Sequence, residues 1–369
     1  MISTALSGAK SPKEPYKLQP ILITLIRHRP YLLNTLLLLL AFVFSVALGA
    51  VFIPPETVLR ILASQLSWLH INPDWPSSFS AIILAVRLPH TVLVVLTGAA
   101  LGSSGAAYQG LFRNPLADPY LIGVASGAGL GAVFSMALKW PTNLLGYYLV
   151  PVGAFLGAVL TVVLVYNLAR VDGLVPLTTL ILAGVALGAF ASALTSFLML
   201  RTELQLHRAI SFLLGGSPIA GWDPVIATLP YMLIGMGLLI VSGHMLNVLQ
   251  FGEEEAKQMG LNVDRAKVFV IVVASLTTAV AVSFSGVIGF IGLIVPHVIR
   301  IVWGPDYRRL IPLSILGGGS SLLLADMLAR ILMAPSTLPV GIVTAMAGAP
   351  FFLREKLDEY LKSMQARVN

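Results

Sequence analysis

The stretch GAALGSSGAAYQGLFRNPLADPYLIGVASGAGLG, residues 98–131, decides the fold that this sequence predicts. Small and apolar residues fill its two outer parts, and a short polar segment separates them. The pairs Asn114-Pro115 and Asp118-Pro119 form turns and prevent one continuous helix. Arg113 lies where the first apolar part meets the turns. The stretch therefore predicts two small-residue helices that flank a capped loop.

The rest of the sequence is equally apolar. Of its 369 residues, 57% are hydrophobic and 11% are charged, whereas soluble domains carry about 25% charged residues. Lipid is the solvent that suits this composition. The chain has no cysteine, which excludes disulfides, thiolate zinc sites and iron–sulfur ligation. The net charge of +7 fits basic loops that orient membrane helices better than it fits nucleic-acid binding.

Ten apolar runs predict an all-α membrane protein with about ten transmembrane helices. A span needs about 20 mostly apolar residues, and the eighth run is short and rich in glycine. The 201–224 segment between two runs could form a short helix outside the bilayer. The runs are 31–53, 91–111, 119–138, 147–169, 176–200, 225–248, 267–286, 288–303, 310–329 and 339–353.

The basic residues predict the orientation of these helices. If the chain begins in the cytoplasm and ten spans alternate, most of its 23 Lys and Arg residues fall in cytoplasmic segments. Both termini are then cytoplasmic. We expect an N-terminal tail at 1–30, a single transmembrane domain at 31–355 and a C-terminal tail at 356–369. Residues 1–30 lack the apolar core and cleavage site of a signal peptide.

Small residues recur at every fourth position in three of the runs. Such stripes let helix backbones approach closely. They fit packing inside one bundle or contact between two copies of the chain, and the sequence leaves both open. The stripes are Gly123, Gly127 and Gly131, then Gly153 and Gly157, then Gly184 and Gly188.

A polar segment between two runs, GEEEAKQMG at residues 252–260, favours a short helix. Its acidic N-terminus suits the helix dipole, and Gly260 can end the helix. Glu253 and Lys257 are four residues apart and can pair. We expect an amphipathic helix on the inner membrane face, with a plain solvated connector as the alternative.

Several stretches resemble motifs of the FecCD family of permeases, and they occur in the same order along the chain. These are the membrane subunits of ATP-binding-cassette (ABC) importers for ferric siderophores, haem and vitamin B12. The resemblance covers about residues 80–355 and includes the signature loop with Arg113, Asn114, Pro115, Asp118 and Pro119. The other stretches are Arg87-Leu88-Pro89, LAGVALG at 182–188, GEEEAKQMGL at 252–261, SGVIGFIGLIVPHVIR at 285–300, LLLADMLAR at 322–330 and LPVGIVTAMAGAPFF at 338–352.

The resemblance implies how the chain would assemble and what it would carry. It implies a multi-pass homodimer in the cytoplasmic (inner) membrane, in contact with lipid, with the pathway at its centre. Two copies of an ABC ATPase subunit would drive it, and an external substrate-binding protein would feed it. The substrate would be an iron chelate, meaning a ferric siderophore or haem, or cobalamin.

The resemblance also implies roles for particular residues. A coupling helix would fit a cleft in the ATPase, and Thr178 and Thr179 would help to form the inner gate. Arg87 and Arg330 would receive acidic residues of the binding protein. At a second matching position, where the vitamin B12 member has an arginine, this chain has His90, which weakens the docking charge at neutral pH. From the residues alone, boundary anchoring is the alternative for Arg87 and Arg330, and Asp326 could pair with Arg330. The coupling helix would comprise Gly252, Glu253, Glu254, Glu255, Ala256, Lys257, Gln258 and Gly260.

The chemistry expected of the chain itself is limited. The sequence contains no G-x-x-x-x-G-K-[ST] phosphate loop, so we expect ATP and Mg²⁺ to bind a partner ATPase. We expect no metal site, because no two of the six histidines have metal-ligand spacing. We also expect no catalytic residues, because no Ser/His/Asp set can be proposed from spacing, and no cofactor in this chain. The alternative function is a secondary transporter or channel that is not coupled to ATP, which would need ionisable residues near the midplane.

Overall fold

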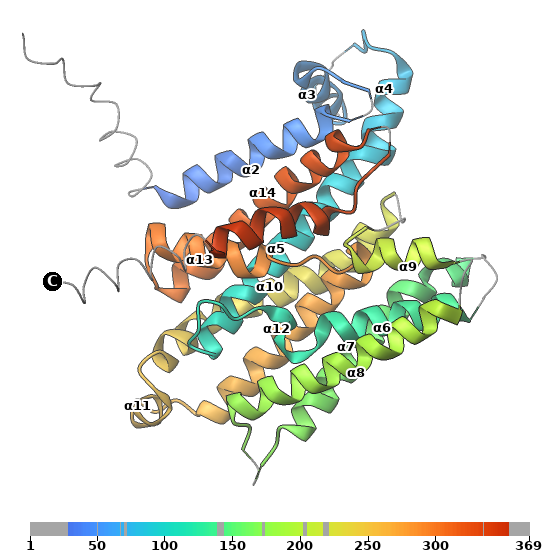
Figure 1. Ribbon diagram of the computed structural model, residues 1–369. Coiled ribbons are helices and arrows are strands. Elements are labelled where there is room, and N and C mark those ends of the chain that lie inside the picture. Colours follow the sequence, from blue (N-terminus) through green and yellow to red (C-terminus); the bar gives the residue numbers. More distant parts are fainter. Residues whose placement is uncertain are drawn as a thin grey trace, which may run out of the picture.

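A computed structural model describes residues 29–353, apart from 50, 67, 70–71, 139–143, 172–173, 202–204, 217–220 and 335. Helices dominate the described residues, and the isolated bridge between Val171 and Leu174 is the β-structure among them. The helices lie side by side in one bundle (Figure 1). The two predicted tails fall almost entirely outside the described residues.

The described helices follow the predicted apolar runs and add short helices between them. They are α2 (Pro30–Ala47), α3 (Pro55–Ser64), α4 (Ser77–Ala81), the π-helix η1 (Ile82–Arg87), α5 (Leu88–Leu111), the 3-10 helix η2 (Pro119–Ile122), α6 (Val124–Ala137), α7 (Leu144–Leu168), α8 (Leu177–Arg201), α9 (Leu206–Leu213), α10 (Asp223–Leu249), α11 (Glu253–Gln258), α12 (Val263–Ser285), α13 (Ile291–Trp303), α14 (Tyr307–Leu332) and a last helix, Val340–Leu353.

Seven of these helices are long and apolar enough to cross a membrane. The other three runs form the shorter apolar helices α6, α13 and Val340–Leu353. A helix of 13 or 14 residues is only about 20 Å long, whereas the hydrocarbon core is about 30 Å thick. Each predicted run is thus helical, but ten complete spans and the location of the termini stay predictions.

The second span begins earlier than its apolar run. Helix α4, η1 and α5 join into one continuous helix, Ser77–Leu111, of 35 residues. Pro89 lies inside this continuous helix, so its missing N–H removes one backbone hydrogen bond, and the π-helix η1 directly precedes it. The predicted runs end at 53 and resume at 91, which leaves residues 54–90 as a loop, but residues 77–90 form the first part of this helix.

The bundle has two distinct ends (Figure 1). We call one the α3 end, where α3 and α4 lie beside the C-terminal ends of α2 and α14. The other, the α11 end, carries α11. Helix α5 runs through the middle of the bundle and packs against α14, α12, α10 and α13. Because it reaches both ends, α5 connects the two sets of candidate residues.

Close packing at glycines explains the stripes that the sequence shows. A side chain at Gly98 of α5 would overlap the backbone of Gly318 in α14. In the same way Gly127 of α6 packs on Gly157 of α7, and Gly184 of α8 packs on the carbonyl of Leu121. In this structure the stripes therefore serve packing within one chain.

Candidate functional site

Two glycines delimit α11. Gly252 precedes the helix with φ +118° and Gly260 follows it with φ +86°, values that side chains rarely allow. Ala256 is fully buried against the bundle, while Glu254, Glu255 and the residues after Ala256 face outward. Helix α11 is therefore a short helix with one buried residue and a broad exposed face.

The ion pairs of α11 differ from the predicted pair. Lys257 Nζ lies 3.0 Å from Glu254 Oε1, three residues away, and not beside Glu253. Glu253 Oε2 instead lies 2.5 Å from Nζ of Lys267 in α12. The Lys267 side chain is only 7% exposed, and a buried ammonium requires a partner, which explains why Glu253 turns toward α12.

Two large apolar side chains flank α11 and are exposed. Phe251 is 67% exposed and Met259 is 58% exposed. Apolar side chains beside charged ones, on a segment between two long helices, form the mixed surface typical of a protein interface. The α11 end therefore presents a candidate docking surface, made of the exposed face of α11 with Phe251 and Met259.

The signature loop lies beside α11, which the sequence did not predict. A side chain built on Gly252 would come within 3.8 Å of the Arg113 guanidinium. Arg113 has φ +49°, an uncommon conformation for a residue other than glycine. The side chains of Asn114 and Asp118 accept hydrogen bonds from backbone N atoms two residues later, at 2.9 Å and 2.8 Å. These turns fix the loop next to the candidate docking surface.

The predicted gate residues lie at the start of a helix. Thr178 and Thr179 belong to the first turn of α8, not to a loop. Thr178 is exposed and Thr179 is half-buried. Their role at a gate stays a prediction.

At the α3 end, two arginines cap the end of α2. Arg87 donates hydrogen bonds to the carbonyl groups of Val46 and Ala47, at 2.8 and 2.9 Å, and to that of Val51. Its side chain is buried. The last carbonyls of a helix lack partners within the helix and attract positive charge. Arg87 therefore holds the C-terminal end of α2 against α5.

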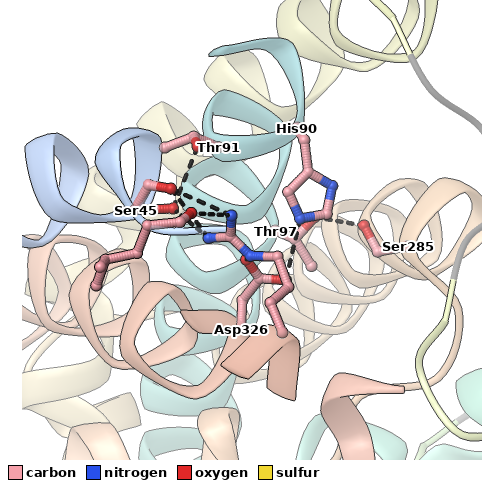
Figure 2. A network of polar contacts seen from close by, with 8 residues as sticks. Ser45, His90, Thr91, Thr97, Ser285 and Asp326 are labelled. Carbon is pink, nitrogen blue, oxygen red and sulfur yellow. Dashed lines mark hydrogen bonds and ion pairs between the residues drawn. The ribbon is translucent and has the colours of Figure 1, made fainter. Parts of the chain in front are cut away.

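Arg330 completes this cap and takes part in a polar network (Figure 2). It donates to the carbonyl of Ser45 and, at 2.8 Å, to the hydroxyl of Ser45. Its Nε lies 2.9 Å from Oδ2 of Asp326, so the expected pair within α14 is formed. Oδ1 of Asp326 lies 3.0 Å from Nε2 of His90. The network thus joins α2, α5 and α14 through side chains.

The exposure of the three predicted docking residues differs. Arg87 as a whole residue is 8% exposed, and the side chain of Arg330 is 14% exposed. Both guanidinium groups already donate hydrogen bonds to backbone carbonyl groups. The side chain of His90 is 44% exposed. Docking at these residues stays a prediction, and His90 is the one most accessible to a partner.

A cavity of about 360 Å³ opens beside His90. Asp326 and Arg330 line it from α14, and His207 and Arg208 line it from α9. Thr97 and Ser285 line the same cavity, and their hydroxyl groups are 2.6 Å apart (Figure 2). Positive side chains outnumber negative ones among the described lining residues, so the cavity suits an acidic group.

Sequence reasoning missed three residues that organise these sites. Ser45 and Tyr120 bind partners that lie far away along the chain, Arg330 and Ile288. Lys267 binds Glu253 across the short link between α11 and α12. No local pattern marks those partners. The sequence feature that could have drawn attention to these three residues is that each is polar and lies within or beside an apolar run. Within the described ranges, no three His, Asp or Glu side chains gather as a metal site requires.

Comparison with known proteins places the chain in a family. The model of the FecCD transport family matches residues 37–354. The chain belongs to the FecCD transport family. The family match extends into residues 37–79, where the sequence motifs gave no resemblance.

Curated relatives of the family are permeases of several transport systems. The chain is 40% identical to an uncharacterized ABC transporter permease protein, YvrB, of Bacillus subtilis, over 88% of this chain and 92% of that protein. It is 43% identical to the cobalamin import system permease protein BtuC of Halobacterium salinarum, over 78% and 77% of the two chains. It is 38% identical to the hemin transport system permease protein HmuU of Yersinia pestis, over 89% and 96%.

A solved structure has the same fold. It is described as an inward-facing conformation of an ABC transporter assigned to the metal-chelate type. The TM-score is 0.73 with 30% sequence identity, over 87% of this chain and 96% of that one. The chain is therefore an ABC transporter permease of multi-pass helical architecture.

Proposed function

We propose that the chain is the permease subunit of an ABC importer for an iron chelate or cobalamin. A homodimer in the cytoplasmic membrane would carry the substrate, two ATPase subunits would drive it and an external binding protein would deliver it. Family membership supports the importer, since relatives are named for cobalamin, hemin and Fe(3+)-citrate transport. Those names differ, so the substrate is proposed only as a class.

The candidate docking surface at the α11 end is the observation that carries the proposal. Its exposed Glu254 and Glu255 supply charge, and Phe251 and Met259 supply apolar contact. An ATPase cleft that buries these four side chains would move α11. The movement would reach the bundle, because Ala256 is buried against it and Glu253 pairs with Lys267 of α12. In this proposal the α11 end faces the cytoplasm.

The α3 end would receive the binding protein. The cavity beside His90 has a positive excess, and an acidic side chain of the binding protein could enter it. His207 and Arg208 on α9 would then contribute together with His90. Arg87 and Arg330 would hold the surrounding helices in position and attract the partner at longer range.

Reconstitution tests this function. The chain, its ATPase subunit and its binding protein would be placed in liposomes, and uptake of labelled cobalamin, haem and ferric siderophores measured. We expect uptake of one of these classes to require ATP and the binding protein. Uptake that proceeds without ATP but follows an ion gradient would instead indicate the secondary-transport alternative.

A further inference from the structure

One tyrosine hydroxyl joins two loops that lie far apart in the sequence. Oη of Tyr120 donates to the carbonyl of Ile288 over 2.8 Å and accepts from the backbone N of Ile288 over 3.2 Å. The backbone N of Tyr120 is itself held by the Asp118 carboxylate. The loop between α5 and α6 therefore holds the backbone of the loop between α12 and α13.

The second of these loops belongs to a joint of three backbone segments, residues 212–216, 286–290 and 338–341. The backbone N of Val287 donates to the carbonyl of Phe212, and that of Gly341 donates to the carbonyl of Leu214, both at 3.0 Å. In apolar surroundings unpaired backbone groups are costly, so these bonds replace those of a continuous helix. The joint thus links α9, α12, α13 and the last helix.

Glycine makes this close contact possible. Gly286 has φ +77°, and a side chain on it would lie 2.5 Å from the carbonyl oxygen of Phe212. Gly215 has φ +81° and approaches both Ile288 and Gly341. The three segments therefore fit together without a gap and would move together.

The joint lines two cavities. Ile288, Gly215 and Val340 line the cavity beside His90. A second cavity, of about 570 Å³, is lined by Tyr120, Val287 and Leu213. A shift of the joint would change the shape of both cavities, and Tyr120 connects the joint to the loop that lies beside α11.

We propose that Tyr120 is a positioning residue for transport, whose hydroxyl ties the signature loop to the joint. This inference rests on the proposed function. When an ATPase displaces α11 and the neighbouring Arg113 loop, Tyr120 carries the displacement to Ile288, and the joint carries it to α9. Without the hydroxyl, the α11 end still responds to the ATPase, but α9 no longer follows.

Hydrogen exchange on the purified chain tests the structural half of the proposal. Tyr120→Phe keeps the ring and removes both bonds to Ile288. We expect the amides of Val287, Ile288 and Gly341 to exchange faster by at least about twofold to tenfold, the change that the loss of a single hydrogen bond gives. The matched control is Tyr108→Phe, which removes a buried hydroxyl that lies 2.6 Å from Ser275 Oγ. The control should leave those three amides unchanged. Unchanged exchange at Val287 and Gly341 in Tyr120→Phe would overturn the proposal.

Thiol labelling of the assembled transporter tests the transmission. The chain has no cysteine, so Ser211→Cys on α9 and Leu116→Cys in the exposed signature loop beside α11 each introduce a single reporter. With Tyr120 present, ATP should change the labelling rate at both positions. With Tyr120→Phe, the response at position 116 should remain and that at position 211 should fall by about threefold or more, with less substrate moved per ATP hydrolysed.

The outcomes separate this inference from the proposed function. An equal response at position 211 with and without the hydroxyl would refute the role of Tyr120. No response to ATP at either position in the Tyr120 parent would refute coupling to an ATPase. In that case the hydrogen-exchange result, which needs no partner, still decides whether Tyr120 holds the joint.

Discussion

At the scale of single residues, Asp306 shows how a cap responds to pH. Its Oδ1 accepts hydrogen bonds from Asn247 Nδ2 at 2.6 Å and from the backbone N of Arg308 at 3.0 Å. The hydrogen bond from Asn247 lowers the pKa of Asp306; the backbone bond and charge of Arg308 and the charge of Arg309 act in the same direction, while partial burial opposes them. The ionised carboxylate therefore stabilises the fold.

This lowered pKa gives a testable sign. The contribution of Asp306 is present above the unfolded value of about pH 4 and is lost as the pH falls through the lower folded pKa. Asp306→Asn should therefore unfold at a lower temperature than the wild type at pH 7, and the difference should shrink toward pH 3. Thermal unfolding in detergent measures it. A difference that does not change with pH would contradict the assignment.

His90 carries a second prediction, about charge at the docking residues. Its side chain is 44% exposed beside the cavity, so an arginine at position 90 would hold a permanent positive charge there. We expect His90→Arg to raise the affinity for the binding protein by about twofold or more, and the gain to shrink at high salt. Titration of the two proteins by calorimetry measures it.

Other groups around position 90 define the control. Asp326 would offset part of a positive charge there, and Arg330, Arg208 and His207 line the same cavity. His90→Gln serves as the matched control, because it is polar but neutral and should not raise the affinity. Equal affinities of the wild type and of His90→Arg would show that His90 takes no part in docking.

At the scale of elements, α11 combines a fixed side with an exposed side. Reversing Glu254 and Glu255 to Lys should leave the fold intact, because exposed ion pairs contribute only about 0–1 kcal/mol. The same change should weaken binding of the ATPase subunit by about tenfold or more, since each reversed charge at an interface adds repulsion. Co-purification and ATP-dependent uptake measure the effect.

Glu253→Gln is the informative comparison for α11. Glu253 pairs with the buried Lys267, so its loss should destabilise the chain by about 1–3 kcal/mol and affect the ATPase interface less. If the double reversal lowered thermal stability as much as Glu253→Gln, the exposed face of α11 would be structural. Normal uptake by the variant with both Glu254→Lys and Glu255→Lys would contradict the proposal that α11 couples the chain to the ATPase.

The contact between α5 and α14 gives a second test at this scale. Gly98→Ala places a methyl group against the backbone of Gly318 and should cost about 1–3 kcal/mol. Gly237→Ala on α10 is the control, because nothing lies within 4 Å of its added methyl group. It should be neutral or stabilising by about 0.5–1 kcal/mol. Equal melting temperatures for the two variants would contradict the close packing.

Sequence patterns predicted elements better than the contacts between them. Among the described residues, hydropathy located the seven helices long enough to span a membrane and the three shorter apolar ones, because each run is continuous along the chain. It did not predict that Ser77–Leu111 is one helix, since Arg87, Pro89 and His90 interrupt the apolar sequence there. The bond between Tyr120 and Ile288 spans 168 residues and leaves no periodic trace. The arginine caps on α2 were likewise hidden, since the sequence marked the arginines but not their carbonyl partners.

At the scale of the whole molecule, the division of labour between subunits can be tested directly. The family consists of permeases, and this sequence has no phosphate loop. We expect the purified chain to hydrolyse no ATP, and to form a complex of two permease and two ATPase subunits that does. Phosphate release and the mass of the complex measure both. ATP hydrolysis by the chain alone, at a rate that rises with its purity, would contradict this prediction.

The central place of α5 has a consequence for biosynthesis. The ribosome completes α5 by residue 111, but its main partner α14 begins only at Tyr307. Until then Ser103, Ser104 and Gln109, all buried in the finished bundle, lie in a membrane that still lacks α13 and α14. A nascent chain at this stage needs an insertase or chaperone to shield those polar groups from lipid. Chains that stop before α13 should therefore remain bound to that machinery or be degraded by membrane proteases.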